Sequence, residues 1–414
     1  MRLAQATAIA AAVIFLALPV AGARAATAAD DQLDSLARRM VAEAIDYDPT
    51  TAYFVGVPPT DNRRWTDYRP AAIAASRAKN DALLADLRRI DVGKLTARKR
   101  FTHAGMVERL EAERGMRICR NELWDVSHMS GWHLQLADVA RDQPLDTDKD
   151  RADALARWSD LPAVVDVQIA NARAGLASGY SAPKPVVTRV IKQIDGLANA
   201  RPEDTPFWQL VERSKDAAFK ASMRDAIVQR IQPAFVRYLA FLKDDYLPAA
   251  RDSIAISAIP DGRACYAALL RTFTTLPRSP EQVFALGNET VSGNLAEVKD
   301  LGRKTFGSDA LPDILKGINE TPANRFASEE EQIAFSRAVV ELSRTKSAPM
   351  FEKMPAQEMQ VKPFEPYLRG SGASSYYERQ IDPGKPAYYR IASEKWREDT
   401  RGGAEITAVH EDTS

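Results

Sequence analysis

Two adjacent residues near the end of the sequence, His410 and Glu411, are of the types that a metal-dependent hydrolase uses. They follow the segment Ala404 to Val409, and together these residues predict a helix that begins near Gly403. On a helix of this kind, histidine binds Zn²⁺ and the adjacent glutamate deprotonates a metal-bound water. A His-Glu pair also occurs by chance in many proteins, so its meaning depends on the rest of the chain.

The elements that must position this end of the chain are mainly helical. Apolar residues recur with the spacing i, i+3, i+4, i+7 in residues 33–45, 186–197 and 235–242, which is typical of helices with one apolar stripe. Ser279 to Gln282 and Ser328 to Glu331 have the residue types that cap helix N-termini. The sequence therefore predicts a large α-helical protein from residue 31 to about residue 350, without internal repeats.

The character of the sequence changes near Pro349. Residues 355–392 are rich in proline, glycine and tyrosine. Within them, Tyr376-Tyr377 and Ala387 to Ile391 are short aromatic runs bounded by turn residues, a pattern that predicts strands. We therefore divide the chain into a leader at 1–25, a helical region at 26–350, and a segment at 351–414 that holds the strands and the start of the predicted metal helix.

The composition limits the classes of protein to which this chain can belong. Its 414 residues contain 56 Lys+Arg and 56 Asp+Glu, so it lacks the basic excess of a general nucleic-acid binder, and we expect no nucleic-acid partner. A hydrophobic content of 45% is that of an ordinary globular protein, which excludes collagen-like and low-complexity chains.

The first residues have the features of a secretory leader. Arg2 supplies the positive end, Ala8 to Leu18 form an apolar run, and Ala23 to Ala25 fit the small-x-small cleavage pattern. The apolar run is shorter than the roughly 20 residues that a bilayer span needs, and no second long apolar run follows. We therefore predict cleavage after Ala25, a periplasmic or secreted protein, and no membrane span.

Both cysteines have apolar neighbours in separate segments. Export permits a disulfide between Cys119 and Cys265 but does not require one. Two buried free thiols are the favoured interpretation, and the pairing stays open.

The other histidines and the tryptophans do not form a second site in the sequence. His128 and His133 are five residues apart and so do not share a helix face; we expect them to pack or form hydrogen bonds. His103 precedes a helical stretch and is expected at the surface or as a cap. The tryptophans are expected mainly in the core, with a ligand cage as the alternative; they are Trp124, Trp132 and Trp158.

An ordered series of segments resembles a bacterial secreted family, the domain of unknown function 885. The matching segments are Asn171 to Tyr180 with Pro183 and Val186-Val187, Leu242 to Pro248 with Ala250-Arg251, Pro260 to Gly262 with Tyr266 and Thr274 to Gly287, Ala387 to Tyr389, and Ala404 to Glu411. Together they extend from about residue 30 to residue 411. The resemblance implies a large, mainly α-helical, zinc-metallopeptidase-like fold with a few short strands near the C-terminus.

The resemblance also implies roles for residues near the C-terminus. The family's metal helix reads His-Glu, three residues, then Gly-His-His, so His410 corresponds to a zinc ligand and Glu411 to the general base. In zinc peptidases a strand before the metal helix pairs with an extended peptide. Tyr388, Tyr389 and Arg390 would then contact a peptide or a small peptide-like ligand, with ordinary edge-strand packing as the alternative.

The sequence departs from the family pattern directly after Glu411, where Asp412 to Ser414 stand in place of Gly-His-His. A catalytic zinc site has three protein ligands and a water, so complete relatives would bind zinc whereas this chain is expected to bind none stably. We therefore expect a fold that is incomplete at its C-terminal end and truncated within the metal helix, and a chain that is weakly active or inactive. The alternative is a non-catalytic periplasmic binding or scaffold protein that uses the helical groove.

The same departure leads to an expectation about stability. A helix that stops about eleven residues after Gly403 is close to the length at which isolated helices become marginal. We therefore expect fraying from about residue 400, and self-association through an exposed apolar cleft.

Overall fold

The computed structural model describes residues 27–413 except 353, 366–368, 370–373 and 379–383, and it is mainly helical. The predicted leader at 1–25 lies outside the described residues. Two compact units divide the chain, an amino-terminal unit that ends at Gln282 and a carboxy-terminal unit that begins at Val283. Among the described residues, no helix combines the length and the apolar character that crossing a membrane requires.

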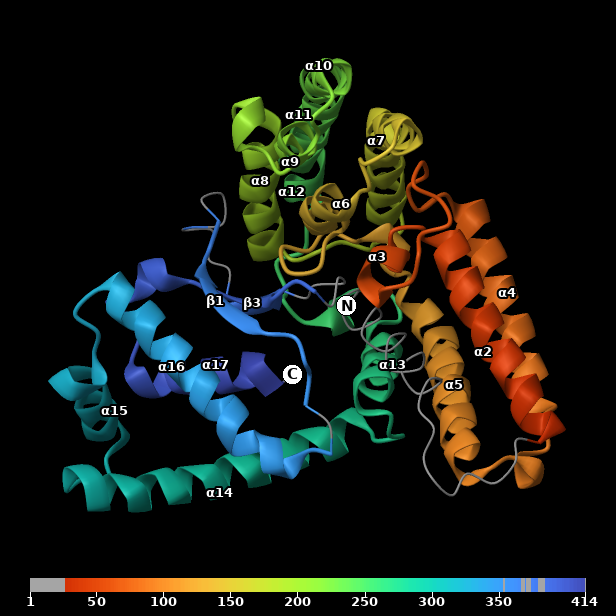
Figure 1. The fold of residues 1–414 in the computed structure, drawn as a ribbon. Coiled ribbons are helices and arrows are strands. Elements are labelled where there is room, and N and C mark those ends of the chain that lie inside the picture. The colour runs from red at the N-terminus through yellow and green to blue at the C-terminus, as the bar shows by residue number, and fades with distance from the viewer. Residues whose placement is uncertain (1–26, 353, 366–368, 370–373, 379–383, 414) are drawn as a thin grey trace. The chain divides into compact units, whose positions relative to one another are not determined.

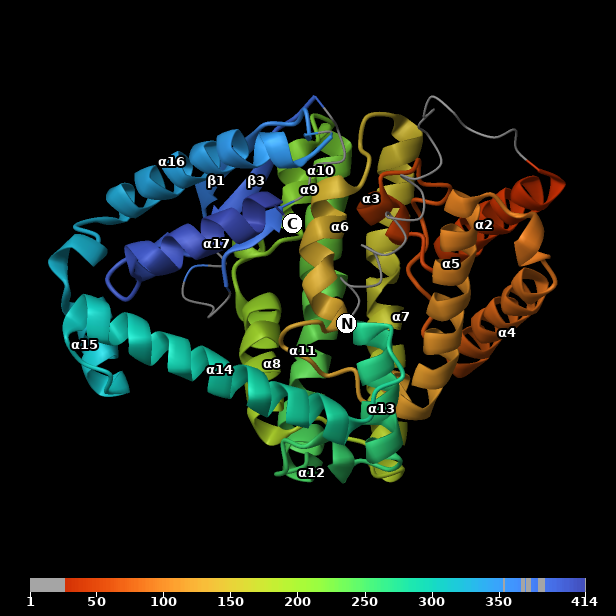
Figure 2. The ribbon, with the colours of Figure 1, turned by 90° about the horizontal axis from the view of Figure 1, so that it is seen from below.

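The amino-terminal unit is built from helices of very different lengths (Figures 1 and 2). Their bounds are α2 Ala28–Tyr47, α3 Thr51–Val55, α4 Pro70–Arg88, α5 Ala97–Met116, α6 Leu136–Asp142, α7 Asp148–Ala177, α8 Lys184–Asn199, α9 Trp208–Arg213, α10 Ala217–Ala226, α11 Gln232–Ala240, α12 Leu247–Ala249 and α13 Gly262–Thr274. Two π-helical segments, Ile227–Ile231 and Phe241–Tyr246, join α10, α11 and α12 into one continuous helical run.

The predicted periodicities correspond to real buried faces. In α8, Val187, Val190 and Ile194 have no exposed surface, as the 3.6-residue period requires. The longest helix of this unit, α7, begins with a capping box in which the Thr147 side chain accepts from the Asp150 N–H and the Asp150 side chain accepts from the Thr147 N–H. The prediction of a large helical fold is confirmed.

Aromatic side chains form the centre of the main core of this unit. Trp158 packs edge-on against Trp65, and Phe235 stacks with both Phe207 and Trp132. Trp158 and Phe207 have no exposed surface. The prediction that Trp132 and Trp158 pack in the core is thereby confirmed, and aromatic pairs of this geometry add to the gain from burial alone.

A fully buried arginine connects this core to the loop after α3. Arg157 of α7 has no exposed surface, and all of its hydrogen bonds go to uncharged acceptors. Its guanidinium donates at 2.7 Å to the Tyr53 hydroxyl, the Gln143 Oε1 and the Asp61 carbonyl, and at 3.1 Å to the Arg64 carbonyl. Since a buried charge is tolerated only when its donors are satisfied, this network determines the path of the loop.

A disulfide between Cys119 and Cys265 joins the segment after α5 to α13. Both cysteines are fully buried beside Met116, with Ile256 and Leu269 packed around them. The favoured interpretation of two free thiols is therefore wrong. The apolar neighbours correctly indicated burial, but a sequence separation of 146 residues gave no indication that the two side chains meet.

The histidines of this unit make hydrogen bonds to neighbouring groups. His133 is buried and its Nε2 donates to Gln193 Oε1 at 3.0 Å, while His128 Nε2 accepts from Arg189 at 3.0 Å, so the expected packing and hydrogen bonding is confirmed. His103 is buried rather than at the surface, with its Nε2 donating to the Leu87 carbonyl at 2.9 Å. The expectation for His103 was wrong because its helix, α5, packs against α4.

The carboxy-terminal unit combines helices with one small sheet. Its elements are α14 Pro280–Phe306, which begins just before the unit, α15 Leu311–Glu320, α16 Glu329–Ser347, β1 Met359–Pro363, β2 Tyr376–Glu378, β3 Ala387–Ile391 and α17 Arg401–Thr413. The strand order is β1-β3-β2, with β1 parallel to β3 and β2 antiparallel to it. Both predicted strands are present, and β1 had not been predicted.

Breaking the disulfide should destabilise the amino-terminal unit. We expect the double variant Cys119→Ala/Cys265→Ala to lose about 2–5 kcal/mol of free energy of unfolding, because the bond closes a long loop. Denaturant unfolding followed by tryptophan fluorescence measures the loss. A reducing agent should lower the stability of the wild type and leave the double variant unchanged; equal stability of the two proteins without reductant would contradict this prediction.

Removing the buried guanidinium should be more damaging than removing an exposed one. We expect Arg157→Met to cost about 3 kcal/mol or more, because it leaves several buried acceptors without a donor. The matched control is Arg63→Met, whose side chain is 65% exposed and which should change the free energy of unfolding by no more than about 0.5 kcal/mol. Similar losses in the two variants would show that the Arg157 network is dispensable.

Candidate functional site

Helix α17, which carries His410 and Glu411, packs on the sheet beside α16 (Figures 1 and 2). Its buried face is made by Ala404 and Ala408, which are 6% and 0% exposed. Ala408 belongs to an apolar cluster with Val339 of α16 and Tyr389 of β3. The small side chains of α17 let the helix lie close to both partners.

The start of α17 is held by several hydrogen bonds. The Thr400 side chain accepts from the Gly403 N–H at 3.1 Å, and the Asn324 side chain accepts from the Gly402 N–H at 3.2 Å. Arg401 forms an ion pair with Glu331 at the start of α16. Helix α17 extends from Arg401 to Thr413, and the fraying expected from about residue 400 stays a prediction. These caps and the packing of Ala408 supply what the short helix lacks by itself.

His410 and Glu411 point to different sides of α17. His410 is exposed, whereas Glu411 is partly buried towards the sheet, where its carboxylate accepts from the Tyr377 backbone N–H. Burial raises the pKa of Glu411 above its ordinary value, although the Tyr377 N–H and the nearby His410 act in the opposite direction. The carboxylate thus has a structural partner in β2.

Two neighbours share this partly buried environment. Burial raises the pKa of Asp412, while the Ser343 side chain and Arg344 oppose the rise. Burial raises the pKa of the Tyr389 hydroxyl to about 12, and the charge of Glu411 contributes in the same direction. The structure therefore brings Glu411 close to Tyr389, one of the residues predicted to contact a peptide.

The three residues predicted to contact a peptide do not converge. Strand β3 is the central strand, paired with β1 through Val361 and Tyr389 and with β2 through Tyr377 and Tyr389. The expectation of an edge strand is therefore wrong, because described strands pair with both sides of β3 from Tyr388 to Arg390. Tyr389 is buried towards the helices, whereas Tyr388 and Arg390 alternate onto the opposite face.

Arg390 already has strong partners on that opposite face. The Nε of Arg390 donates to the Glu378 carboxylate at 2.5 Å, and its Nη2 lies 3.1 Å from the Glu365 Oε1. The guanidinium also lies 5.0 Å from the centre of the Tyr388 ring. Arg390 and Tyr388 therefore stabilise the sheet, and a substrate carboxylate would have to compete with two protein carboxylates for the arginine.

The donor atoms near α17 do not fit a zinc ion. Catalytic zinc takes three protein ligands and a water. Within the described part of the chain, no group of three or more His, Cys, Asp and Glu side chains could hold a metal. His410 is exposed on α17, and the described residues around it do not supply the two further protein ligands that such a site needs.

A polar network on α16 was missed by sequence reasoning. Gln332 is 1% exposed and its amide donates to Asp399 at 2.5 Å, while Glu329 accepts from Ser393 at 2.7 Å. The only signal in the sequence was the Ser328 to Glu331 capping pattern. The structure confirms that cap, since Ser328 accepts from the Glu331 N–H at 3.2 Å. The pattern did not indicate that the acidic residues of this turn also anchor the segment leading to α17.

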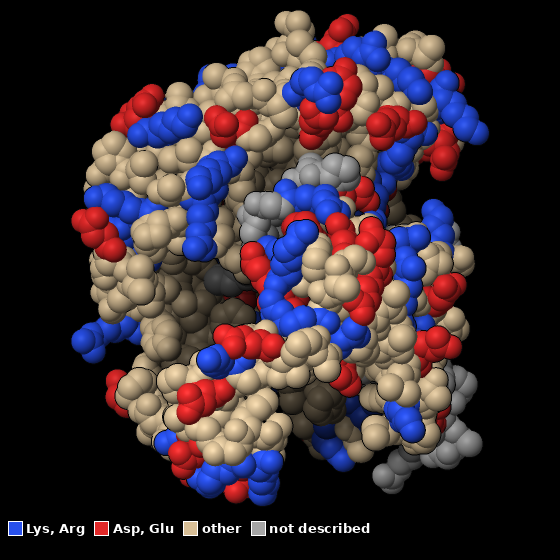
Figure 3. All heavy atoms as spheres, turned by 90° about the vertical axis from the view of Figure 1, so that its left-hand side faces the viewer, with Lys and Arg blue, Asp and Glu red and all other residues tan. Residues whose placement is uncertain are grey.

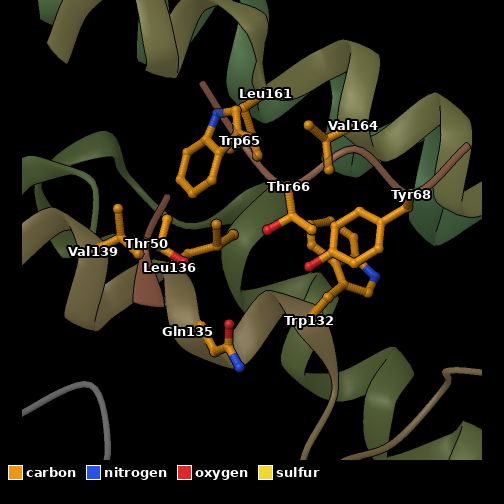
Figure 4. Close-up of a pocket in the computed structure, with 10 residues that line it drawn as sticks. All are labelled: Thr50, Trp65, Thr66, Tyr68, Trp132, Gln135, Leu136, Val139, Leu161 and Val164. Carbon is orange, nitrogen blue, oxygen red and sulfur yellow. The ribbon is translucent and has the colours of Figure 1, made fainter. Parts of the chain in front are cut away.

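A small cavity of about 20 Å³, room for a single water molecule, lies among the described residues of the amino-terminal unit (Figure 4). It mixes hydroxyl and amide groups with apolar walls. The lining residues are Thr50, Trp65, Thr66, Tyr68, Trp132, Gln135, Leu136, Val139, Leu161 and Val164. Its size suits a structural water and does not suit a peptide substrate.

Charges of both signs are interspersed on the face drawn in Figure 3. Lysine and arginine side chains lie among aspartate and glutamate side chains, in agreement with the equal numbers of each in the sequence. Ion pairs are frequent among the described residues, and Lys304 with Asp300 at 2.5 Å is an example. Exposed pairs of this kind contribute little to stability.

Comparison with known proteins identifies a family and a fold. The family described as "Bacterial protein of unknown function (DUF885)" matches residues 49–413. No curated protein matches the chain. A crystal structure of a protein described as a lipoprotein from Colwellia psychrerythraea is similar with a TM-score of 0.79 and 18% sequence identity, over 93% of this chain and 71% of that one. At this identity the likeness shows the fold.

The partly buried carboxylate of Glu411 leads to a pH-dependent prediction. Because its folded-state pKa is raised above the ordinary value of 4.5, its contribution to stability is present below pH 4.5 and is lost as the pH rises through the folded-state pKa. Glu411→Gln keeps an acceptor for the Tyr377 N–H without the charge. We expect it to raise the unfolding temperature at pH 7 by on the order of 2 °C, and to leave it unchanged at pH 4.

The control for this prediction is Glu405→Gln on the exposed face of the same helix. Thermal unfolding followed by circular dichroism at both pH values should show no pH-dependent gain for the control. A Glu411→Gln protein that is less stable than the wild type at pH 7 would show that the ionised carboxylate is a net stabilising contact.

Proposed function

The chain belongs to the DUF885 family of bacterial proteins, and on that premise we propose that it acts outside the cytoplasm as a protein of metallopeptidase-like ancestry with weak or no peptidase activity of its own. The observation that carries this proposal is that, among the described residues, no third His, Cys, Asp or Glu side chain lies with His410 and Glu411 where it could share a metal ion. A general base must lie within hydrogen-bond reach of the water that it activates. In this chain Glu411 is partly buried and interacts with the Tyr377 backbone of β2, which gives its carboxylate a structural contact.

The proposed location is supported by three observations. The sequence begins with the features of a secretory leader, and the protein of similar fold from Colwellia psychrerythraea is described as a lipoprotein. The buried disulfide between Cys119 and Cys265 is of a kind that persists in oxidising compartments such as the periplasm.

The metallopeptidase-like ancestry rests on the placement of the His-Glu pair. The pair lies on a helix, as the family pattern requires, and this helix directly follows the strands in the sequence. In complete relatives, His410 would correspond to a zinc ligand and Glu411 to the base that activates water for attack on a peptide bond. In this chain the described donors do not fit zinc, so we derive no catalytic step.

A second candidate function is a non-catalytic binding or scaffold protein. It is favoured by helix α14, which presents large apolar side chains to solvent, such as Phe284 at 73% and Val291 at 56% exposure. An apolar helix face of this kind is typical of a surface that binds a polypeptide. The ligand would then be a helix or an extended peptide contacted through apolar side chains.

The proposal predicts the result of adding zinc to the purified mature protein. After dialysis against zinc and removal of the unbound metal, elemental analysis should find far less than one zinc per chain. The rate at which the protein hydrolyses a mixed library of fluorogenic peptides should stay near the rate measured in zinc-containing buffer without the protein. Since the proposal assigns no catalytic step to this pair, His410→Ala and Glu411→Gln should give the same metal content and the same rates as the wild type.

Two outcomes would contradict the proposal. One is about one tightly held zinc per chain that is lost in His410→Ala. The other is peptide hydrolysis that falls by about 10²-fold or more in Glu411→Gln, which is the loss expected for a general base.

A further inference from the structure

Within the carboxy-terminal unit, the other described elements leave helix α14 uncovered from Phe284 to Lys299. From Phe284 to Lys299 every residue is exposed, and Gly302 is the buried residue of this helix. Gly302 is covered by Ile314 of α15, so the exposed stretch lies before this contact.

The sequence of this stretch does not favour a helix that stands alone. It contains glycine at positions 287 and 293, asparagine at 288 and 294, and β-branched residues at 290 and 291. All of these residue types have lower helix propensity than alanine, and glycine costs close to 1 kcal/mol at each position. A helix of this composition is held mainly by burying an apolar face against a partner.

Such a face is present as one straight stripe. Phe284, Val291, Leu295 and Val298 are spaced by seven, four and three residues. At about 100° per residue they fall within a sector of about 60°, and they extend over about 21 Å of the helix. Their side chains are 73%, 56%, 38% and 38% exposed, in that order.

The charges beside the stripe are arranged to suit a second copy of the same helix. Glu281 lies near the start of α14, and Lys299 and Arg303 lie near its end. Arg303 also forms ion pairs with Asp300 and Asp309 of its own chain, so Lys299 is the less engaged of the two cations. On the helical wheel all three flank the same edge of the stripe. When two copies of α14 pair in antiparallel orientation around a two-fold axis, this edge of one helix meets the same edge of the other. The start of each helix then lies beside the end of its partner.

We propose that the stripe on α14 is a docking surface for a second copy of this chain, paired in antiparallel orientation around Val291. In this register Glu281 of one copy lies between Lys299 and Arg303 of the other. Phe284 meets Val298, and Leu295 lies over Gly287, where an added Cβ would meet no atom of its own chain within 4 Å. This inference goes beyond the proposed function and holds whether or not the chain is catalytic.

The first test is the mass of the full mature chain in solution, measured by light scattering after size-exclusion chromatography and by sedimentation. We expect a dimer at micromolar concentration. Val291→Glu places two like charges on the two-fold axis and should give a monomer. The matched control, Leu286→Glu, lies on the opposite side of α14 at a residue that is 46% exposed, and it should remain a dimer.

The second test addresses orientation. Glu281→Lys should raise the dissociation constant of the dimer by roughly tenfold, and the double variant Glu281→Lys/Lys299→Glu should restore most of the affinity. Arg303 is kept because it pairs with Asp300 and Asp309 of its own chain. Val291→Cys should form a disulfide between copies, whereas Leu286→Cys should not. The native cysteines do not interfere because they are paired.

Three outcomes would overturn the inference. They are a monomeric wild type, a dimer that persists in Val291→Glu, and a charge reversal that does not restore binding. Circular dichroism of each variant distinguishes loss of the dimer from loss of the fold.

Discussion

Ala408 has no exposed surface because α17 lies directly against α16 and β3, and the arrangement of the carboxy-terminal unit depends on this close contact. A sheet of three strands with at most five residues each is stable only when one face is covered. The helices α16 and α17 cover the face that carries Val361 and Tyr389. The same contact brings the Glu411 carboxylate to the backbone of β2, and it leaves His410 on the exposed side.

The amino-terminal unit depends on a different kind of constraint. Arg157 is a charged residue in the core whose guanidinium donates to Tyr53, Gln143 and two carbonyl groups, and which also lies against the rings of Tyr53 and Trp65. Each acceptor lies far from Arg157 in the sequence or on another element, so the guanidinium connects α3, α6, α7 and the loop between α3 and α4. The disulfide between Cys119 and Cys265 does the same for α5 and α13 through a covalent bond.

The charged side chains that have partners within the fold and the apolar side chains that remain exposed bear on function in different ways. A hydrolytic ancestry is what we propose from the His-Glu pair, whereas the contacts of Glu411 and Arg390 give these side chains structural partners. Charged groups that are fully engaged within a fold are less available for a substrate, because a substrate must first replace those partners. In contrast, the apolar stripe of α14 is exposed in the described structure, which is why we expect association there.

The sequence alone was sufficient for features with a local cause. The stripe at 186–197 and the cap at Ser328 depend on residues within one or two turns, and both are present in α8 and α16. The strands at 376–377 and 387–391 were also recognisable from their composition. Tertiary structure alone decided that β3 is central, that Cys119 meets Cys265, and that Glu411 faces the sheet while His410 does not. These features depend on contacts between distant segments, and periodicity within one segment contains no information about which distant segment will cover it.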